Sequence, residues 1–269
     1  MSATFRSLLL TVLVVASCGR KEQSVDTTPV GDSDAAGYQM VAIPAGSFMM
    51  GCNAVVDTQC EADESPYHSV QLSGFSIDKT EVTQAAFQKC VANGICVAPD
   101  NSVTGCNWDP QTRADFPVVC VSFVQATAYC ESSSRRLPTE AEWERAARGT
   151  EGRVYPWGNE LPTCERAQSS ECGTDVVRVA SLASGATPDG IVDMAGNAAE
   201  WVSDWYDAAY YQSSPSQDPS GPATGVGRVI RGGSFFYDAT YVRASNRGAQ
   251  EPAAPRFSLG FRCAKAGTP

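Results

Sequence analysis

The sequence is poor in histidine and in basic residues. His68 is the single histidine among 269 residues, and no two cysteines are separated by two residues. A zinc site of cysteine and histidine ligands is therefore disfavoured, as are a two-histidine iron site and a Ser-His-Asp hydrolase. We expect His68 to be a strand-edge or salt-bridge residue. With 20 basic against 30 acidic residues and a net charge of -10, the chain lacks the basic face that nucleic-acid binding requires.

The sequence also lacks an apolar run long enough to remain in a bilayer. The stretch at residues 8–16 follows Arg6 and is too short for a permanent transmembrane helix, but it has the proportions of a secretory signal. Residues 15–18, Val-Ala-Ser-Cys, resemble a bacterial lipoprotein signal, in which cleavage leaves Cys18 as a lipid-bearing first residue. An ordinary signal peptide cut nearby, or a chance apolar start, is the alternative.

These features divide the chain into three parts. Residues 1–18 are the expected signal peptide. Residues 19–37 are polar and carry few large apolar side chains, so we expect a disordered tether. Residues 38–269 are long enough to bury a substantial core as one folded domain. The sequence thus predicts a membrane-anchored lipoprotein of the bacterial cell envelope, facing the periplasm or the exterior, with the lipid as its only membrane contact.

Cysteine usage fits an exported protein. Apart from Cys18 the chain has ten cysteines, an even number, which is typical of a disulfide framework in an oxidising compartment. Close spacing suggests four of the pairs, although spacing does not prove connectivity: Cys52 with Cys60, Cys90 with Cys96, Cys106 with Cys120, and Cys164 with Cys172.

Regular secondary structure is predicted to be sparse. Ser122 with Gln125, and again Thr139 with Glu142, have the spacing of a helical capping box. Pro44 interrupts the first apolar segment, and several loops are rich in Pro, Ser and Gly. We expect helices over residues 83–90, 122–133 and 139–148, and strands over residues 41–48, 176–182, 228–230 and 259–263. Residues 68–77 are expected to form a pair of strands or one strand bent by Gly74. The sum is an α+β domain.

Residues 191–205 combine carboxylates, a glycine and two tryptophans. The side chains of Asp193 and Glu200 and the backbone carbonyls of Gly196 and Ala198 can turn hard oxygens toward one point, which is the ligand set that Ca²⁺ prefers. The alternative is a turn followed by an amphipathic segment whose acids are merely solvated, because the spacing is not that of an EF-hand.

Three further blocks give the chain a family resemblance. Residues 136–149, 231–235 and 259–263, together with 191–205, resemble the formylglycine-generating enzymes, also called sulfatase-modifying factors. The resemblance extends from about Met40 to Ala266. It implies a single formylglycine-generating-enzyme-like domain with a fold akin to C-type lectins.

The resemblance also implies specific residue roles. It places a fifth disulfide between Cys130 and Cys263. It assigns structural calcium to the four positions from Asp193 to Glu200. The family's active cleft is implied near five residues: Ser234, Tyr237, Tyr241, Arg243 and Arg247.

The copper ligands of the family are missing. Formylglycine-generating enzymes hold Cu(I) between two cysteines in the loop after Arg-Gly-Gly-Ser, and soft thiolates suit that ion. Aligned from this block, the two positions fall on Tyr237 and Val242, neither of which supplies a thiolate. Ala199 also stands where the family commonly has an aromatic residue. These losses argue against copper and leave no residue that we assign to catalysis.

Two hypotheses follow. The first is a lipid-anchored binding or assembly protein whose cleft holds an exported peptide, protein or small ligand. The second is an oxidoreductase that modifies an exported protein or metabolite by a formylglycine-generating-like or pyoverdine-maturation-like route. Fold analogy alone supports the second, and fold does not fix function.

Overall fold

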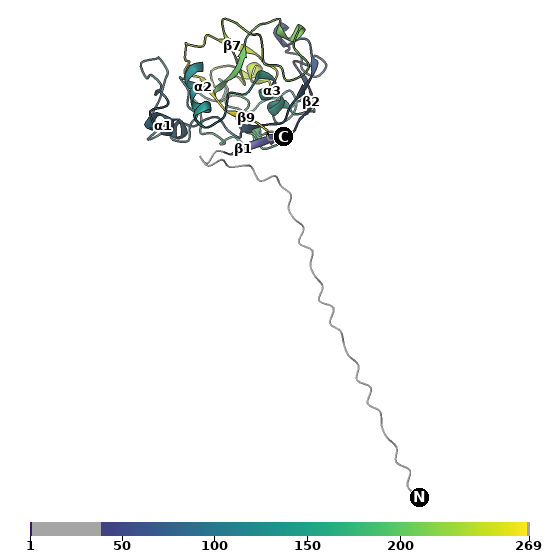
Figure 1. Cartoon of the computed structure of the whole chain (residues 1–269), viewed down its shortest axis with the longest axis horizontal. Helices are drawn as coiled ribbons and strands as arrows, with labels where there is room; N and C mark the ends of the chain where they lie inside the picture. The colour runs from purple at the N-terminus through teal and green to yellow at the C-terminus, as the bar shows by residue number, and fades with distance from the viewer. Residues whose placement is uncertain (2–38, 268–269) are drawn as a thin grey trace. The chain divides into compact units, whose positions relative to one another are not determined.

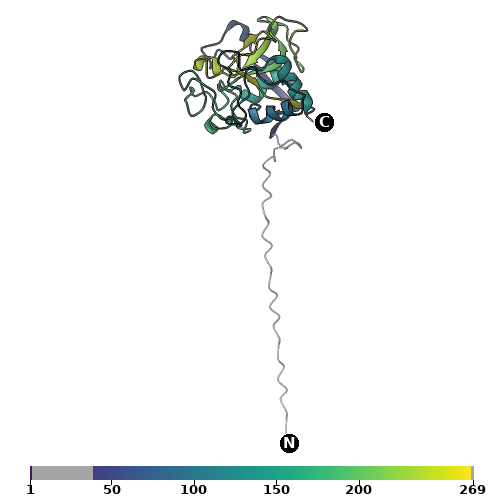
Figure 2. The ribbon, with the colours of Figure 1, turned by 90° about the vertical axis from the view of Figure 1, so that its left-hand side faces the viewer.

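The computed structural model describes Met1 and residues 39–267. The expected signal peptide, Cys18 and the tether lie outside the described residues. Among the residues it describes, no helix is long and apolar enough to cross a membrane. The domain has mixed helix and strand content, as expected, and loops make up much of it (Figures 1 and 2).

The strands form three small sheets. The strand predicted at residues 41–48 is divided at Pro44, which cannot donate a hydrogen bond to a ladder. Residues 68–77 form two strands, which are separated by Gly74. One sheet has the order β1-β4-β9, a second pairs β2 with β3, and the third has the order β7-β6-β5-β8. The bounds are β1 Met40–Ile43, β2 Gly46–Met50, β3 His68–Leu72, β4 Phe75–Asp78, β5 Ala199–Trp205, β6 Arg228–Arg231, β7 Gly248–Gln250, β8 Leu259–Phe261 and β9 Ala264–Ala266.

The predicted strand at residues 176–182 is wrong. The amides of Val177 and Ala180 donate to the side chains of Asn197 and Asp193, and the amide of Val179 donates to the carbonyl of Asp115. Because these donors are used by side chains and a loop, the segment forms no ladder.

The three predicted helices are confirmed with small shifts in their bounds. Thr83 caps α1, and the capping boxes of Ser122 and Thr139 both form. In Figure 1, α1 and α2 lie at one side of the domain and α3 lies near β2. The α-helices are α1 Gln84–Ala92, α2 Phe123–Ser132 and α3 Glu140–Arg148, and the short 3-10 helices are η1 Ala62–Glu64, η2 Ala183–Gly185, η3 Tyr210–Gln212 and η4 Ala239–Val242.

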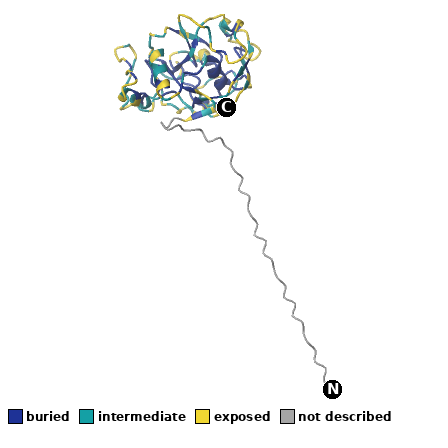
Figure 3. Ribbon diagram, viewed as in Figure 1, coloured by how far each residue is buried: buried dark blue, intermediate teal, exposed yellow. Residues whose placement is uncertain are grey.

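The core lies on both faces of β5. Trp201 packs in a cluster with residues of α1 and α2 such as Phe87 and Tyr129. Val202 points the other way, into a cluster that includes Trp143 of α3, as the alternation of side chains along a strand requires. Buried residues accordingly gather at the centre of the domain in Figure 3. All nine residues of α3 are buried, including its charged ones.

All five predicted disulfides are present. Four close short loops, and the bond between Cys130 and Cys263 joins α2 to the segment between β8 and β9. The start and the end of the domain also meet in one sheet, because β4 pairs with both β1 and β9. The two ends of the fold are therefore fixed to each other by a covalent bond and by backbone hydrogen bonds.

We predict that the long-range disulfide contributes most to stability. The bond between Cys130 and Cys263 spans 133 residues and that between Cys90 and Cys96 spans 6. Loop-closure entropy gives about 4 to 5 kcal/mol for the first and about 2 kcal/mol for the second. Denaturant unfolding of the two double alanine variants should show this order, and an equal or reversed loss would contradict it.

Candidate functional site

A cavity of about 130 Å³ lies where the cleft is expected. Its wall comes from β5, β6 and the loop that follows β6, and it includes Tyr237 and Tyr241. Gly233 has a φ of 65°, and a Cβ there would lie 2.6 Å from the carbonyl oxygen of Tyr241, so glycine lets η4 fold closely over this loop. The lining residues are Ala199, Ile230, Arg231, Gly233, Tyr237, Tyr241 and Asn246.

The other three expected cleft residues do not line this cavity. Ser234 is fully buried, and its hydroxyl accepts a hydrogen bond from the amide of Phe236. Arg243 and Arg247 are also buried, in ion pairs with carboxylates. The structure therefore brings only the two tyrosines to the cavity and places both arginines in the interior of the domain.

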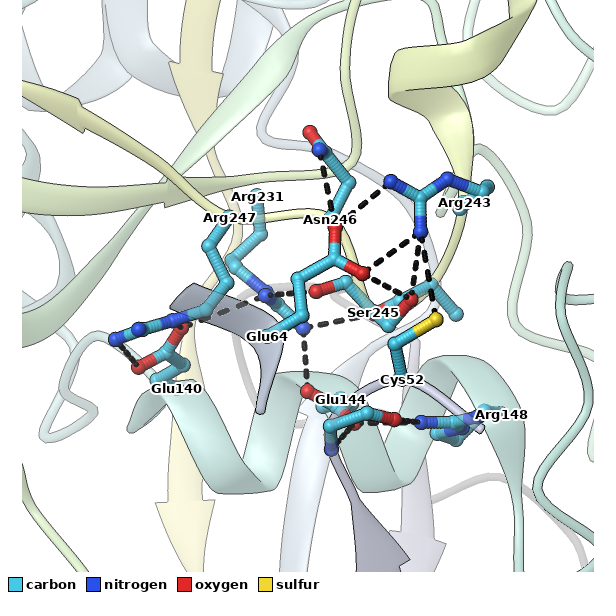
Figure 4. Close-up of polar contacts among 12 residues, drawn as sticks. Cys52, Glu64, Glu140, Glu144, Arg148, Arg231, Arg243, Ser245, Asn246 and Arg247 are labelled. Atoms are coloured by element: carbon cyan, nitrogen blue, oxygen red, sulfur yellow. Dashed lines mark hydrogen bonds and ion pairs between the residues drawn. The ribbon is translucent and has the colours of Figure 1, made fainter. Parts of the chain in front are cut away.

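Arg247 belongs to a buried ion network centred on α3 (Figure 4). It pairs with Glu140 at 2.7 Å, and Arg231 on β6 reaches Glu144 at 2.6 Å and Glu140 at 3.4 Å. Arg148 pairs with Glu144 one turn further along the helix, at 2.9 Å. Although burial opposes ionisation, Arg247 and Arg231 hold the pKa of Glu140 below its ordinary value.

Arg243 forms a second buried network beside the first. Its guanidinium donates to both oxygens of Glu64, at 2.8 and 2.7 Å, and to Asp57 at 3.0 Å. Ser245 donates to Glu64 as well. Cys52 lies at the edge of this network, with its sulfur 3.9 Å from Arg243 (Figure 4). Together the two networks hold four arginines and four carboxylates, so their charges balance.

One candidate metal cluster in the described part of the chain falls at the same place. The sulfurs of Cys52 and Cys60 and a carboxylate oxygen of Glu64 lie within 4.8 Å of one another. The two sulfurs are bonded to each other, and Arg243 holds the carboxylate. This group therefore has no thiolate to offer a metal ion.

Three of the predicted calcium residues, Asp193, Gly196 and Ala198, lie in a tight turn before β5, and Glu200 lies in β5 itself. Asp193, Gly196 and Asn197 all have positive φ, and a Cβ on Gly196 would lie 2.2 Å from the carbonyl oxygen of Gln168. The turn is therefore specific for glycine at this position. The carboxylate of Asp193 accepts a hydrogen bond from the amide of Ala180 at 2.6 Å.

The carboxylate of Glu200 accepts hydrogen bonds from Arg262 and Trp143. Both of its oxygens accept hydrogen bonds from Arg262, at 2.7 to 3.0 Å, and one also accepts from the indole of Trp143 at 2.7 Å. Among the described residues, Glu200 does not belong to a group of three or more Cys, His, Asp or Glu side chains whose ligand atoms lie within 4.8 Å of one another. Its carboxylate is already paired with Arg262, whereas that of Asp193 accepts from a backbone amide.

Glu81, which was not predicted from the sequence, interacts with Asp193. One oxygen of Glu81 accepts from the side-chain amide of Asn197, whereas no donor in the described part of the chain reaches the buried Oε2. Burial raises the pKa of Glu81 well above its ordinary value, and the negative charge of Asp193 adds to the effect. Two adjacent buried carboxylates, one of which has an oxygen without a donor, need a proton or a cation between them. Glu81 and Asp193 therefore fit either a shared proton, as a hydrogen bond between the two side chains, or a hard cation.

The comparisons with known proteins agree with this fold. A family model described as a sulfatase-modifying factor enzyme 1-like domain matches residues 26–267, and the chain belongs to this family. The formylglycine-generating enzyme of Streptomyces coelicolor is 35% identical over 281 residues, which covers 83% of this chain and 88% of that enzyme.

Two solved structures are also similar. Treponema denticola variable protein 1 superposes with a TM-score of 0.73 at 28% identity, covering 89% of this chain and 100% of that one. PvdO from Pseudomonas aeruginosa superposes with a TM-score of 0.75 at 25% identity, covering 87% of this chain and 97% of that one. The single-domain fold expected from the sequence is thus confirmed.

Asp204 should make stability fall with rising pH. Burial, followed by repulsion from Glu140, raises the pKa of Asp204 to about 7. The folded protein therefore holds a proton that the unfolded chain, with a pKa near 4, has released. Stability is retained below about pH 4 and decreases between pH 4 and 7, by at most about 1.4 kcal/mol per pH unit.

The variant Asp204→Asn should lose this part of the slope in denaturant unfolding between pH 4 and 7. Asp189→Asn, at an exposed turn, is the control and should keep the slope of the parent protein. An unchanged slope in Asp204→Asn would contradict the raised pKa.

Proposed function

We propose that this domain binds an exported peptide or small ligand in the cavity at Tyr237 and Tyr241, without copper-dependent oxidation. One observation carries the proposal: the two positions that align with the family's copper ligands are Tyr237 and Val242. Val242 is fully buried in an apolar cluster with Val154 and Tyr155. A packed valine side chain in that position supplies no ligand to a metal.

The state of the cysteines supports the same conclusion. The ten cysteines from Cys52 to Cys263 are all paired in disulfides. Activated oxygen chemistry of the formylglycine-generating type needs thiolates on Cu(I), and the described domain has no free thiol to provide them. The cavity nevertheless persists, with two hydroxyls and an amide in its wall, and such a mixture of apolar surface and a few polar groups is typical of a ligand site.

Structural calcium is part of the proposal. Asp193 and Glu81 would hold the ion, with the carbonyl oxygens of Gly196 and Ala198 as further ligands and Glu200 fixed nearby by Arg262. Support comes from the buried oxygen of Glu81, which has no donor in the described residues, and from the hard oxygen donors of the turn. Bound calcium would neutralise the two acids and hold the turn before β5.

The location is likewise a proposal that rests on the sequence. A lipid on Cys18 would anchor the domain at the bacterial cell envelope through the tether at residues 19–37. The five disulfides support an oxidising compartment. The partner would then be a peptide, protein or small molecule outside the cytoplasm.

A second candidate function is oxidation of an exported protein or metabolite. The identity to the formylglycine-generating enzyme of Streptomyces coelicolor favours it, as does the likeness to PvdO. Such an activity would need an oxidant bound by residues other than cysteine. Oxygen consumption separates it from the binding function.

We predict that the Cys18→Ser chain, purified without reductant, titrates no thiol in denaturant and binds no Cu(I). It should also consume no oxygen with a cysteine-containing peptide of the sulfatase type. The formylglycine-generating enzyme of Streptomyces coelicolor is the positive control. Titratable thiols together with oxygen uptake would reject the binding function and favour the second candidate.

We also predict that a calcium chelator lowers the melting temperature, by about 5 to 10 °C if calcium is present at about 100 times its dissociation constant. Asp193→Ala combined with Glu81→Gln should abolish this difference, whatever the melting temperature of the variant itself. Asp189→Ala, an exposed acid in the preceding turn, should retain it. Equal melting with and without chelator in the parent protein would refute the calcium site.

A further inference from the structure

The cavity has about the volume of one aromatic ring. Ala199 of β5, Ile230 of β6 and the backbone of Gly233 contribute apolar surface to its wall. Its volume of about 130 Å³ is close to that of apolar protein cavities of about 150 Å³ that bind benzene. The cavity therefore accepts a single aromatic ring and is too small for a larger fused system.

The space exists because residue 199 is small. Ala199 is buried on the first position of β5 and faces the cavity. An aromatic side chain at this position would occupy the volume itself. A ligand ring placed here would contact the strand that also carries Glu200 and Trp201, which is a rigid part of the domain.

Aromatic side chains continue from the cavity to the surface. Tyr237 and Tyr241 contact each other with ring centroids 5.5 Å apart, and Phe236 contacts both Tyr237 and Phe257. Phe236 is 57% exposed and Tyr241 is 39% exposed. An exposed aromatic surface beside a cavity is typical of a recognition site.

The rim next to these rings is acidic. Glu171 and Asp238 are both exposed, and Glu171 accepts a hydrogen bond from the amide of Ala239, directly after Asp238. The loop of Glu171 is closed by the disulfide between Cys164 and Cys172. Within the described residues, Arg256 is the basic side chain that donates a hydrogen bond to the hydroxyl of Tyr237. Two carboxylates against one guanidinium favour a cationic group on the ligand.

We propose that the cavity binds the aromatic side chain of a peptide and that the acidic rim selects a basic residue next to it. The ring enters between Ala199, Ile230 and Tyr241, and the neighbouring lysine or arginine lies over Glu171 and Asp238. Arg231 also lines the cavity, but its guanidinium is held in the interior by Glu140 and Glu144, so the exposed acids provide the charge selection. This inference rests on the proposed binding function and specifies its ligand.

Four short blocked peptides test the inference by titration calorimetry with the full chain: acetyl-Phe-Arg-amide, acetyl-Phe-Glu-amide, acetyl-Ala-Arg-amide and acetyl-Ala-Glu-amide. The first should bind most tightly. Replacing its phenylalanine by alanine should weaken binding by about tenfold or more, because burial of the ring contributes at least that factor. Replacing arginine by glutamate should weaken it by a smaller, salt-dependent factor.

Two sets of variants locate the site. Ala199→Trp fills the cavity and should abolish binding, and Ala199→Val, which is easier to accommodate, should weaken it partially. Glu171→Gln with Asp238→Asn should remove the preference for arginine over glutamate while keeping the preference for phenylalanine over alanine. Val97→Ala, at an exposed apolar position that does not line the cavity, should change nothing.

The outcomes also separate this inference from the binding function itself. If the phenylalanine peptides bind no better than the alanine peptides, or if Ala199→Val binds as tightly as the parent protein, the inference is wrong, although the domain can still bind another ligand. If the chain consumes oxygen with a cysteine-containing peptide, the binding function fails, irrespective of these affinities.

Discussion

The fold depends on the buried ion pairs between α3 and two arginines from distant parts of the chain. Glu140 and Glu144 lie on one side of this helix, and Arg231 and Arg247 reach them across 87 to 107 residues of sequence. Removing one partner of such a pair leaves an unpaired buried charge, which costs far more than the intact pair contributes. The pairs therefore specify how α3 sits against β6 and its following loop, in a domain where short strands provide few backbone hydrogen bonds.

The same electrostatic constraint explains why the cleft arginines are absent from the cleft. Arg243 and Arg247 come soon after Tyr237 and Tyr241 in the sequence, yet their side chains point into the interior. Arg243 pairs there with the buried carboxylate of Glu64, and Arg247 pairs with that of Glu140. Charge balance in the interior thus decides the orientation of the loop. Asp204 forms no ion pair with an arginine in the described part of the chain. Burial, followed by repulsion from Glu140, therefore raises its pKa.

Local signals were enough to predict the three helices, but they did not predict the strands β5, β7 and β9, which depend on pairing between distant segments. The caps at Thr83, Ser122 and Thr139 gave the helices because a capping residue acts within its own turn. By contrast β7 and β9, at three residues each, exist only through their partners. Glu81 could not be recognised as a member of the acid site, because 116 residues separate it from Asn197 and no local pattern marks it.

The division between scaffold and cavity accounts for a domain that keeps its family fold without the family's copper ligands. None of the ion pairs of α3 involves Tyr237, Val242 or Ala199, so these positions can change without leaving a buried charge unpaired. Val242 packs with apolar neighbours and adds to the core. Ala199 is a small residue on a strand that is hydrogen-bonded on both sides, to β6 and to β8. Substitution at such positions can therefore change the cavity, while the network that holds α3 continues to define the fold.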